Sequence, residues 1–125
     1  MSKVFTDVRV FMNACGQTTP SKPIGRTDLS DLYRKLIKEE YDEFVVAYAN
    51  KDETEELDAC FDMIWVITGY MHARGWDTSA MWDEGAKSNL AKIDKDTGMV
   101  IRRPEDGKIL KPEGWKTPNF EQFVR

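Results

Sequence analysis

Histidine and cysteine are scarce in this sequence, which has one histidine and two cysteines among 125 residues. A single histidine, His72, leaves no route to a Ser–His–Asp or Cys–His arrangement, and we expect it to be a surface residue near the exposed end of a helix. Cys15 and Cys60 do not form a disulfide framework, and we expect Cys60 to pack as a small hydrophobic side chain in an apolar stretch. This cysteine usage favours a reducing, cytoplasmic setting.

Long apolar runs, a basic excess and glycine-rich phosphate loops are also missing. No uncharged run is long enough to span a membrane, and the first seven residues lack the basic-then-apolar layout of a secretory signal. The net charge of -4 argues against non-specific nucleic-acid binding, so we expect neither a membrane nor a nucleic acid as partner. Neither GxGxxG nor GxxxxGK[ST] occurs. Acidic residues can still bind a polyphosphate through divalent cations, because the ions invert the local charge.

The chain is predicted to be a single domain, residues 1–125, with four helices and a non-helical tail. Capping and stop residues predict helices over about residues 6–14, 29–50, 53–74 and 78–92. The stretch 18–26 contains Pro20, Pro23 and Gly25 and is expected to be a loop. Further on, segments 99–101 and 108–110 flank a turn, which predicts an irregular tail or a short β-hairpin.

The third predicted helix is apolar on nearly all sides. From Ala59 to Met71 only Asp62 and Thr68 are clearly polar, and such a helix is buried on most of its surface. One chain of this length offers few partners to bury it. We therefore expect an all-α, four-helix bundle that is completed by a second copy, in a homodimer or a homotetramer.

Acidic side chains interrupt the apolar stripe of the second predicted helix. At 100° per residue Glu40 falls inside the stripe, with Leu36 and Phe44 one turn away on either side. Glu43 lies at the edge of the stripe and Glu39 flanks it. Burying a carboxylate is unfavourable unless a partner compensates its charge. An ordinary solvated helix face therefore does not explain why Glu40 lies inside the apolar stripe.

The third predicted helix repeats this anomaly. Asp58 and Asp62 are one turn apart on one face, and Glu55 lies on the same stripe. Like charges brought together on a largely apolar surface repel one another and raise each other's pKa. Oxygen ligands for Mg²⁺ or Mn²⁺ resolve the repulsion, and two or three such ions would bridge a triphosphate and activate a water. The alternatives are a pairing with Arg or Lys and, for residues 53–56, a solvated helix face.

The tail has a basic and an apolar component. Lys92, Lys108 and Lys111 follow the fourth predicted helix, and apolar side chains such as Trp115 and Phe120 accompany them. We expect these apolar residues to dock the tail on the helices and so to bring its lysines toward bound phosphates. The alternative is a solvated basic patch on a loose C-terminus.

Four segments, in this order, resemble the all-alpha NTP pyrophosphohydrolases, a group that includes MazG-like, phosphoribosyl-ATP pyrophosphohydrolase-like and dimeric dUTPase-like enzymes. Residues 34–43 resemble the EExxE helix of the group, and residues 58–69 resemble its acidic third helix. Residues 88–92 resemble the S-N-x-x-K segment of the phosphoribosyl-ATP branch, and residues 106–115 its D-G-K-x-x-K tail. The resemblance runs from about Phe11 to Phe120.

This resemblance implies a MazG-like fold and a metal-dependent enzyme that converts a nucleoside triphosphate to the monophosphate and pyrophosphate. It implies two or three Mg²⁺ or Mn²⁺ ions per site, with Glu39 either a ligand or the residue that holds the attacking water. From its position we expect Glu39 to be the general base, and we expect Glu39 and Glu40 to be catalytic. The implied metal ligands are Glu39, Glu40, Glu43, Asp58 and Asp62; the implied substrate-binding residues are Asn13, Asn89, Lys92 and Lys108. Apart from the resemblance, Trp65 is a core candidate, and the alternative is a substrate-binding role in which it lines the base pocket.

The sequence departs from the family pattern in two places. The usual ExxD element has Glu at position 59, which is Ala59 here, so either Asp58 takes that role or Glu55 does in a shifted register. A family histidine is replaced by Asn13, whose amide can pair with a base edge. We expect a purine substrate such as dGTP or GTP, as in some small phage members. The alternatives are dUTP, dCTP or phosphoribosyl-ATP, or a non-catalytic helical metal-binding or interaction module.

Overall fold

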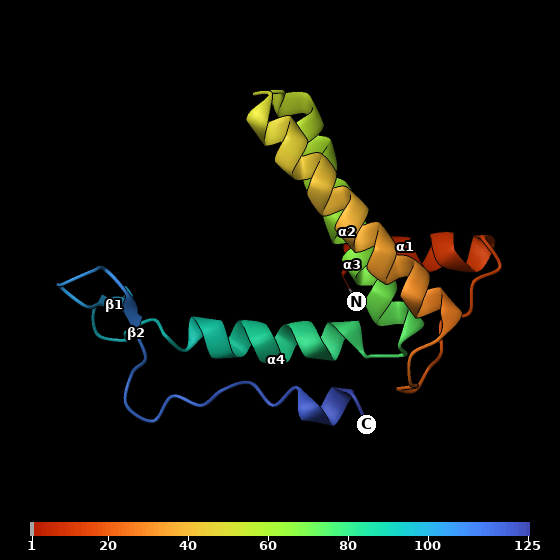
Figure 1. Cartoon of the computed structure of the whole chain (residues 1–125). Coiled ribbons are helices and arrows are strands. Elements are labelled where there is room, and N and C mark those ends of the chain that lie inside the picture. The colour runs from red at the N-terminus through yellow and green to blue at the C-terminus, as the bar shows by residue number, and fades with distance from the viewer. Residues whose placement is uncertain (1) are drawn as a thin grey trace.

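The structure, a computed structural model, describes residues 2–125 and shows a mainly helical chain with a small β-hairpin in its tail (Figure 1). The helices are α1 (Lys3–Ala14), α2 (Asp28–Ala49), α3 (Glu53–Ala73) and α4 (Thr78–Leu90). They are followed by the strands β1 (Ile101–Arg102) and β2 (Ile109–Leu110), which pair antiparallel, and by the short 3-10 helix η1 (Glu121–Phe123). The predicted all-α class with a hairpin tail is confirmed.

Side-chain caps decide where the first two helices begin. Thr27 and Ser30 form a reciprocal capping box at the start of α2, in which each hydroxyl accepts a hydrogen bond from the other residue's backbone N–H. At the start of α1 the hydroxyl of Ser2 accepts from the N–H of Phe5 at 3.4 Å. The first helix therefore begins at Lys3, three residues before the predicted Thr6, because Ser2 supplies an earlier cap.

The antiparallel hairpin of α2 and α3 is the centre of the fold, and α1 packs against one end of it (Figure 1). The core side chains come from these three helices: Val8, Met12, Tyr33, Val66 and Ala73. Burial of these side chains supplies the main driving force for their assembly. α4 extends away from the hairpin and does not join this core.

The C-terminal tail docks on α4. The indole Nε1 of Trp115 donates to the carbonyl of Ser88 at 2.7 Å, and the Ser88 hydroxyl donates to the carbonyl of Lys116 at 3.2 Å. The backbone N–H of Asn119 donates to Glu84 Oε1 at 3.0 Å. These bonds join α4 and the tail into one unit, residues 78–125, which we call the arm (Figure 1).

His72 is buried, with 1% of its surface exposed, so the prediction of a surface position was wrong. Its Nε2 lies 2.8 Å from the carbonyl oxygen of Phe5, and its Nδ1 lies 3.1 Å from Nη2 of Arg9. Burial above all, and then the charge of Arg9, lower the pKa of His72, while the Phe5 carbonyl opposes them. The first turns of α1 cover the end of α3 that carries His72. The sequence did not reveal this contact, because it forms only when the two helices pack together.

One face of the middle of α3 is exposed within one chain. Phe61 is 57% exposed, Ile64 55% and Ile67 45%, and Val46 on α2 is 59% exposed. The sequence predicted a helix buried on most sides, and a single copy leaves these side chains about half exposed. Among the described residues, no helix has both the length and the apolarity needed to cross a membrane.

Candidate metal centre

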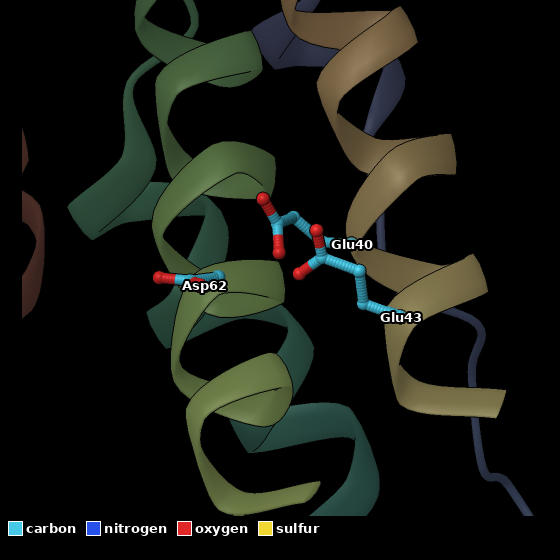
Figure 2. A group of neighbouring side chains, drawn as sticks. All are labelled: Glu40, Glu43 and Asp62. Atoms are coloured by element: carbon cyan, nitrogen blue, oxygen red, sulfur yellow. The ribbon is translucent and has the colours of Figure 1, made fainter. Parts of the chain in front are cut away.

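Three carboxylates converge between α2 and α3. Glu40 and Glu43 lie one turn apart on α2, and Asp62 lies on α3. One oxygen from each of the three lies within 4.8 Å of the others. Figure 2 shows both glutamates reaching from α2 toward α3, the helix that carries Asp62. Glu40 and Asp62 are half-buried and Glu43 is exposed, so the group is open to solvent on one side.

The electrostatics of this group disfavour three bare negative charges. Burial, followed by the neighbouring carboxylates of Glu43 and Asp62, raises the pKa of Glu40 to about 7. Burial and then the charges of Asp58 and Glu43 raise the pKa of Asp62. Across residues 2–125 no lysine or arginine forms a salt bridge with any of the three converging acids. Pairing with basic side chains therefore does not account for them.

The donor set fits a hard divalent cation. Oε2 of Glu40 is buried and has no hydrogen-bond partner among the described residues, which is an unfavourable state for a carboxylate oxygen. A cation between the helices would satisfy this oxygen and remove the repulsion among the three acids. Carboxylate oxygens without nitrogen or sulfur ligands suit Mg²⁺ or Mn²⁺.

The family model described as phosphoribosyl-ATP pyrophosphohydrolase matches residues 8–89 of this chain. The chain belongs to this family. The match includes the three converging carboxylates and ends within α4, before Lys92. No curated protein matches the chain. Membership in the phosphoribosyl-ATP pyrophosphohydrolase family supports a pyrophosphohydrolase-type activity.

The other predicted acids of this family member are not among the three converging carboxylates. Glu39 is exposed on α2 and is not one of the three carboxylates that meet. Asp58 is exposed one turn before Asp62 and acts on it through its charge. Glu55 lines an open hollow of about 420 Å³ beside Glu43, at the turn that joins α2 to α3. Asp58 and Glu55 thus both lie near the centre. Of the two, Asp58 is the one whose charge raises the pKa of Asp62.

Aromatic side chains flank the centre of this pyrophosphohydrolase family member on one side. Trp65, one turn after Asp62, is half-buried, and its ring meets that of Phe11 edge-on at 5.6 Å between centroids. Phe61 lies 5.8 Å from Trp65 and is largely exposed. Sequence reasoning named Trp65 and missed the two phenylalanines, although Phe61 adjoins Asp62 in the sequence. Asn13 lies in the last turn of α1, where its amide oxygen accepts from the Thr19 hydroxyl at 3.1 Å.

The predicted phosphate-binding residues lie on the arm. The ammonium of Lys92 donates to Oδ1 of Asn89 at 3.3 Å, and both side chains are on or directly after α4. Lys108 is exposed beside β2, and its backbone N–H donates to Asp106. Because the arm extends away from the hairpin, one chain does not bring these residues to its own carboxylates (Figure 1).

Proposed function

We propose that this protein is a metal-dependent nucleoside triphosphate pyrophosphohydrolase. The observation that carries the proposal is the convergence of Glu40, Glu43 and Asp62 around a buried carboxylate oxygen that has no hydrogen-bond partner within residues 2–125. Family membership supports the pyrophosphohydrolase class. Together they point to cleavage between the α- and β-phosphates, which yields the monophosphate and pyrophosphate.

The acidic side chains have different proposed roles. Glu40, Glu43 and Asp62 hold the metal, with Asp58 contributing charge or a further ligand. Mg²⁺ or Mn²⁺, when bound, neutralises phosphate charge and lowers the pKa of a coordinated water. Glu39, exposed beside the centre, accepts the proton of the attacking water as general base. The water oxygen bonds to the α-phosphorus, the bond from that phosphorus to the bridging oxygen breaks, and pyrophosphate leaves with that oxygen.

A purine triphosphate such as dGTP or GTP is the proposed substrate. Trp65, Phe11 and Phe61 form an aromatic surface next to Asp62, and flat aromatic rings favour stacking with a base. The amide of Asn13 lies at the nearby end of α1 and is the proposed contact for a base edge. The description of the matching family makes phosphoribosyl-ATP the second candidate substrate.

The test is a substrate panel. The protein is incubated in H₂¹⁸O with dGTP, GTP, dATP, dUTP, dCTP or phosphoribosyl-ATP and with Mg²⁺ or Mn²⁺, and the products are separated by anion-exchange chromatography. We expect pyrophosphate and a monophosphate that carries the ¹⁸O, fastest from the purine triphosphates. Label in the pyrophosphate instead would contradict attack at the α-phosphorus, and a uniform lack of turnover would favour the non-catalytic module.

Two variants make the panel specific to the centre. Glu40→Gln keeps the volume of the side chain and removes its charge, so turnover should disappear. Asp42→Asn is the matched control, because Asp42 is an exposed acid on the same helix whose carboxylate pairs with Lys38 at 2.7 Å. Equal activity in both variants would remove Glu40 from the proposed centre.

A further inference from the structure

We propose that a hollow between α1 and the turn that precedes α4 binds inorganic phosphate in a protonated form, with Arg9 donating to its oxygens and Asp77 accepting from its O–H group. The hollow is separate from the metal centre, because His72, which contacts Arg9, follows Asp62 on α3 by about three helical turns. The inference therefore adds a second binding site and does not depend on the proposed function.

Three segments that are distant in the sequence border the hollow, which has a volume of about 260 Å³. Its lining comprises Arg9 of α1, residues 19–21 of the loop before α2, and residues 75–77 of the turn before α4. Gly75 has a φ of +68°, and a Cβ there would overlap the backbone carbonyl of Lys22, so this glycine lets the turn close on the loop. The walls of the hollow are thus fixed by tertiary contact.

Opposite charges line the hollow without pairing. Arg9 and Asp77 both belong to its lining, yet no salt bridge joins them, and neither forms one with any other residue of the described part of the chain, residues 2–125. The carboxylate of Asp77 caps α4, where its Oδ1 accepts from the N–H of Ala80 at 3.0 Å. A ligand that accepts hydrogen bonds on one side and donates one on the other would bridge the two side chains.

His72 orients the guanidinium of Arg9. Arginine only donates, so the 3.1 Å contact between its Nη2 and Nδ1 of His72 requires a neutral imidazole that accepts at Nδ1. The other ring nitrogen then carries the hydrogen and donates to the carbonyl of Phe5 at 2.8 Å. A guanidinium has five N–H donors, and His72 takes one of them. Arg9 therefore retains donors for an anion.

Buried polar atoms without hydrogen-bond partners gather at this hollow. Within residues 2–125, two such atoms belong to its lining, Nε of Arg9 and Nε1 of Trp76. Two more are the hydroxyl oxygens of Thr78 and Ser79, which follow the lining in the sequence. Buried polar groups are usually paired, and a bound ion or ordered water is a common reason for an exception. Their gathering at one place supports a polar occupant.

Inorganic phosphate has the chemistry that Arg9 and Asp77 together require. Between pH 7 and pH 8 it has negatively charged oxygens that accept from a guanidinium, and it keeps at least one O–H that donates to a carboxylate. Sulfate has the same shape but no O–H at this pH, so it would meet the carboxylate of Asp77 with like charge. A doubly ionised phosphate monoester such as ribose 5-phosphate has the same disadvantage.

Nuclear magnetic resonance in the presence of EDTA tests the site without a metal. The indole N–H signal of Trp76 is assigned by its loss in Trp76→Phe, and phosphate, sulfate or ribose 5-phosphate is titrated into the whole chain at pH 8. Phosphate should shift this signal until it saturates, with a dissociation constant at least about 10-fold lower than that of either other anion. An unmoved signal would overturn the site, and equal affinity for sulfate or ribose 5-phosphate would overturn its assignment to inorganic phosphate.

Arg9→Gln removes the cation and should weaken phosphate binding at least about 10-fold. The matched control is Arg26→Gln, which changes an exposed arginine of the adjoining loop outside the hollow and should leave the affinity unchanged. Circular dichroism checks that each variant folds. If Arg9→Gln does not fold, Arg9→Lys replaces it, because lysine keeps the charge but loses the fork of donors. Undiminished phosphate affinity in the folded Arg9 variant, or an equal loss in Arg26→Gln, would overturn the role of Arg9.

Asp77→Asn tests the acceptor. Asparagine caps a helix as well as aspartate does, and its amide can donate to an oxyanion. Sulfate should then bind about as tightly as phosphate. A preference for phosphate that persists in this variant would overturn the role of Asp77.

Glu40→Gln separates this site from the metal centre. In EDTA this variant should bind phosphate with the affinity of the wild type, and a loss of binding would place the phosphate among the carboxylates and overturn the inference. Phosphate binding at the hollow by a protein that turns over no nucleotide would contradict the proposed function and leave this site standing.

Discussion

The ring of Tyr33 on α2 lies so close to the backbone of Gly69 on α3 that a Cβ on residue 69 would fall 2.7 Å from Cδ1 of the ring and closer still to Cε1. Glu40 follows Tyr33 by about two helical turns, and Asp62 precedes Gly69 by the same number. Because α2 and α3 are antiparallel, the register that seats the tyrosine on the glycine also places Glu40 opposite Asp62.

Gly69→Ala should therefore loosen both the core and the metal centre. The added methyl group collides with the Tyr33 ring, which is buried in the core and cannot retreat freely. We expect a loss of about 1–3 kcal/mol in the free energy of unfolding, as is typical of overpacking, measured by urea denaturation. Affinity for Mn²⁺ should fall as well, because the two helices must separate.

Gly85→Ala is the matched control in α4. A Cβ there would lie 3.2 Å from Cζ of Phe120, a half-exposed side chain of the tail that has room to shift. We expect stability close to that of the wild type. Equal stability of both alanine variants would show that the contact between Tyr33 and Gly69 does not fix the register.

The raised pKa of Glu40 makes the metal-free protein less stable as pH rises. Between the ordinary carboxyl pKa of 4.5 and about 7 the folded chain binds this proton more readily than the unfolded chain does, so the free energy of unfolding falls across that interval. Glu40→Gln removes this slope. At pH 8 with a chelator, the variant should be about 1 kcal/mol more stable than the wild type, and at pH 4 nearly equal to it.

Urea denaturation at pH 8 and at pH 4 checks the sign of the difference in unfolding free energy between Glu40→Gln and the wild type. Asp42→Asn, with its exposed carboxylate, should follow the wild type at each pH. A Glu40→Gln variant that is less stable than the wild type at pH 8 in the chelator would mean that the carboxylate has a favourable partner within the chain.

Divalent ions should raise the melting temperature of the wild type. Ions that bind only the folded state add ~2.7 kcal/mol of stability at about 100 times the dissociation constant. Binding also displaces the proton of Glu40, so the affinity for Mn²⁺ should increase with pH through about 7. Scanning calorimetry with and without EDTA measures the effect. Asp62→Asn should abolish it, and an undiminished shift in that variant would contradict the assignment of Asp62 as a ligand.

Removal of residues 92–125 should affect substrate use more than helix content. All four helices lie before the cut, so the circular dichroism signal should change little. Turnover should fall by at least about 10-fold, equal to ~1.4 kcal/mol of transition-state stabilisation, because Lys92, Lys108 and Lys111 are lost. Mn²⁺ binding without nucleotide should remain. Undiminished turnover in the truncated protein would show that these lysines do not contact phosphate.

Lys92→Ala tests whether the side chain of Lys92 alone contributes to phosphate binding. It should raise the nucleotide concentration needed for half-maximal turnover and leave Mn²⁺ affinity nearly unchanged. Lys3→Ala is the control, since Lys3 is an exposed lysine that pairs with Asp7 within α1. A matching effect of both substitutions would reduce the role of Lys92 to general surface charge.

The sequence by itself determined the local structure and the unusual acids. Helical periodicity put Glu40 inside an apolar stripe and Asp62 within an apolar helix, and the spacing of turn residues located the hairpin of β1 and β2. These features depend on residues a few positions apart, whose relative directions follow from the geometry of one helix or one turn. The conclusion that carboxylates meet at an apolar surface was therefore available before any tertiary contact was known.

Only the tertiary structure decided the register of the hairpin, the burial of His72 and the direction of the arm. Each depends on an approach between distant residues: Tyr33 with Gly69, Phe5 with His72, and Lys22 with Gly75. Such contacts are fixed by how side-chain volumes fit between packed helices, and no periodicity along the chain encodes that fit. For this reason the sequence named Lys92 and Asp62 as parts of one site, while the structure places Asp62 on α3 of the hairpin and Lys92 on the arm.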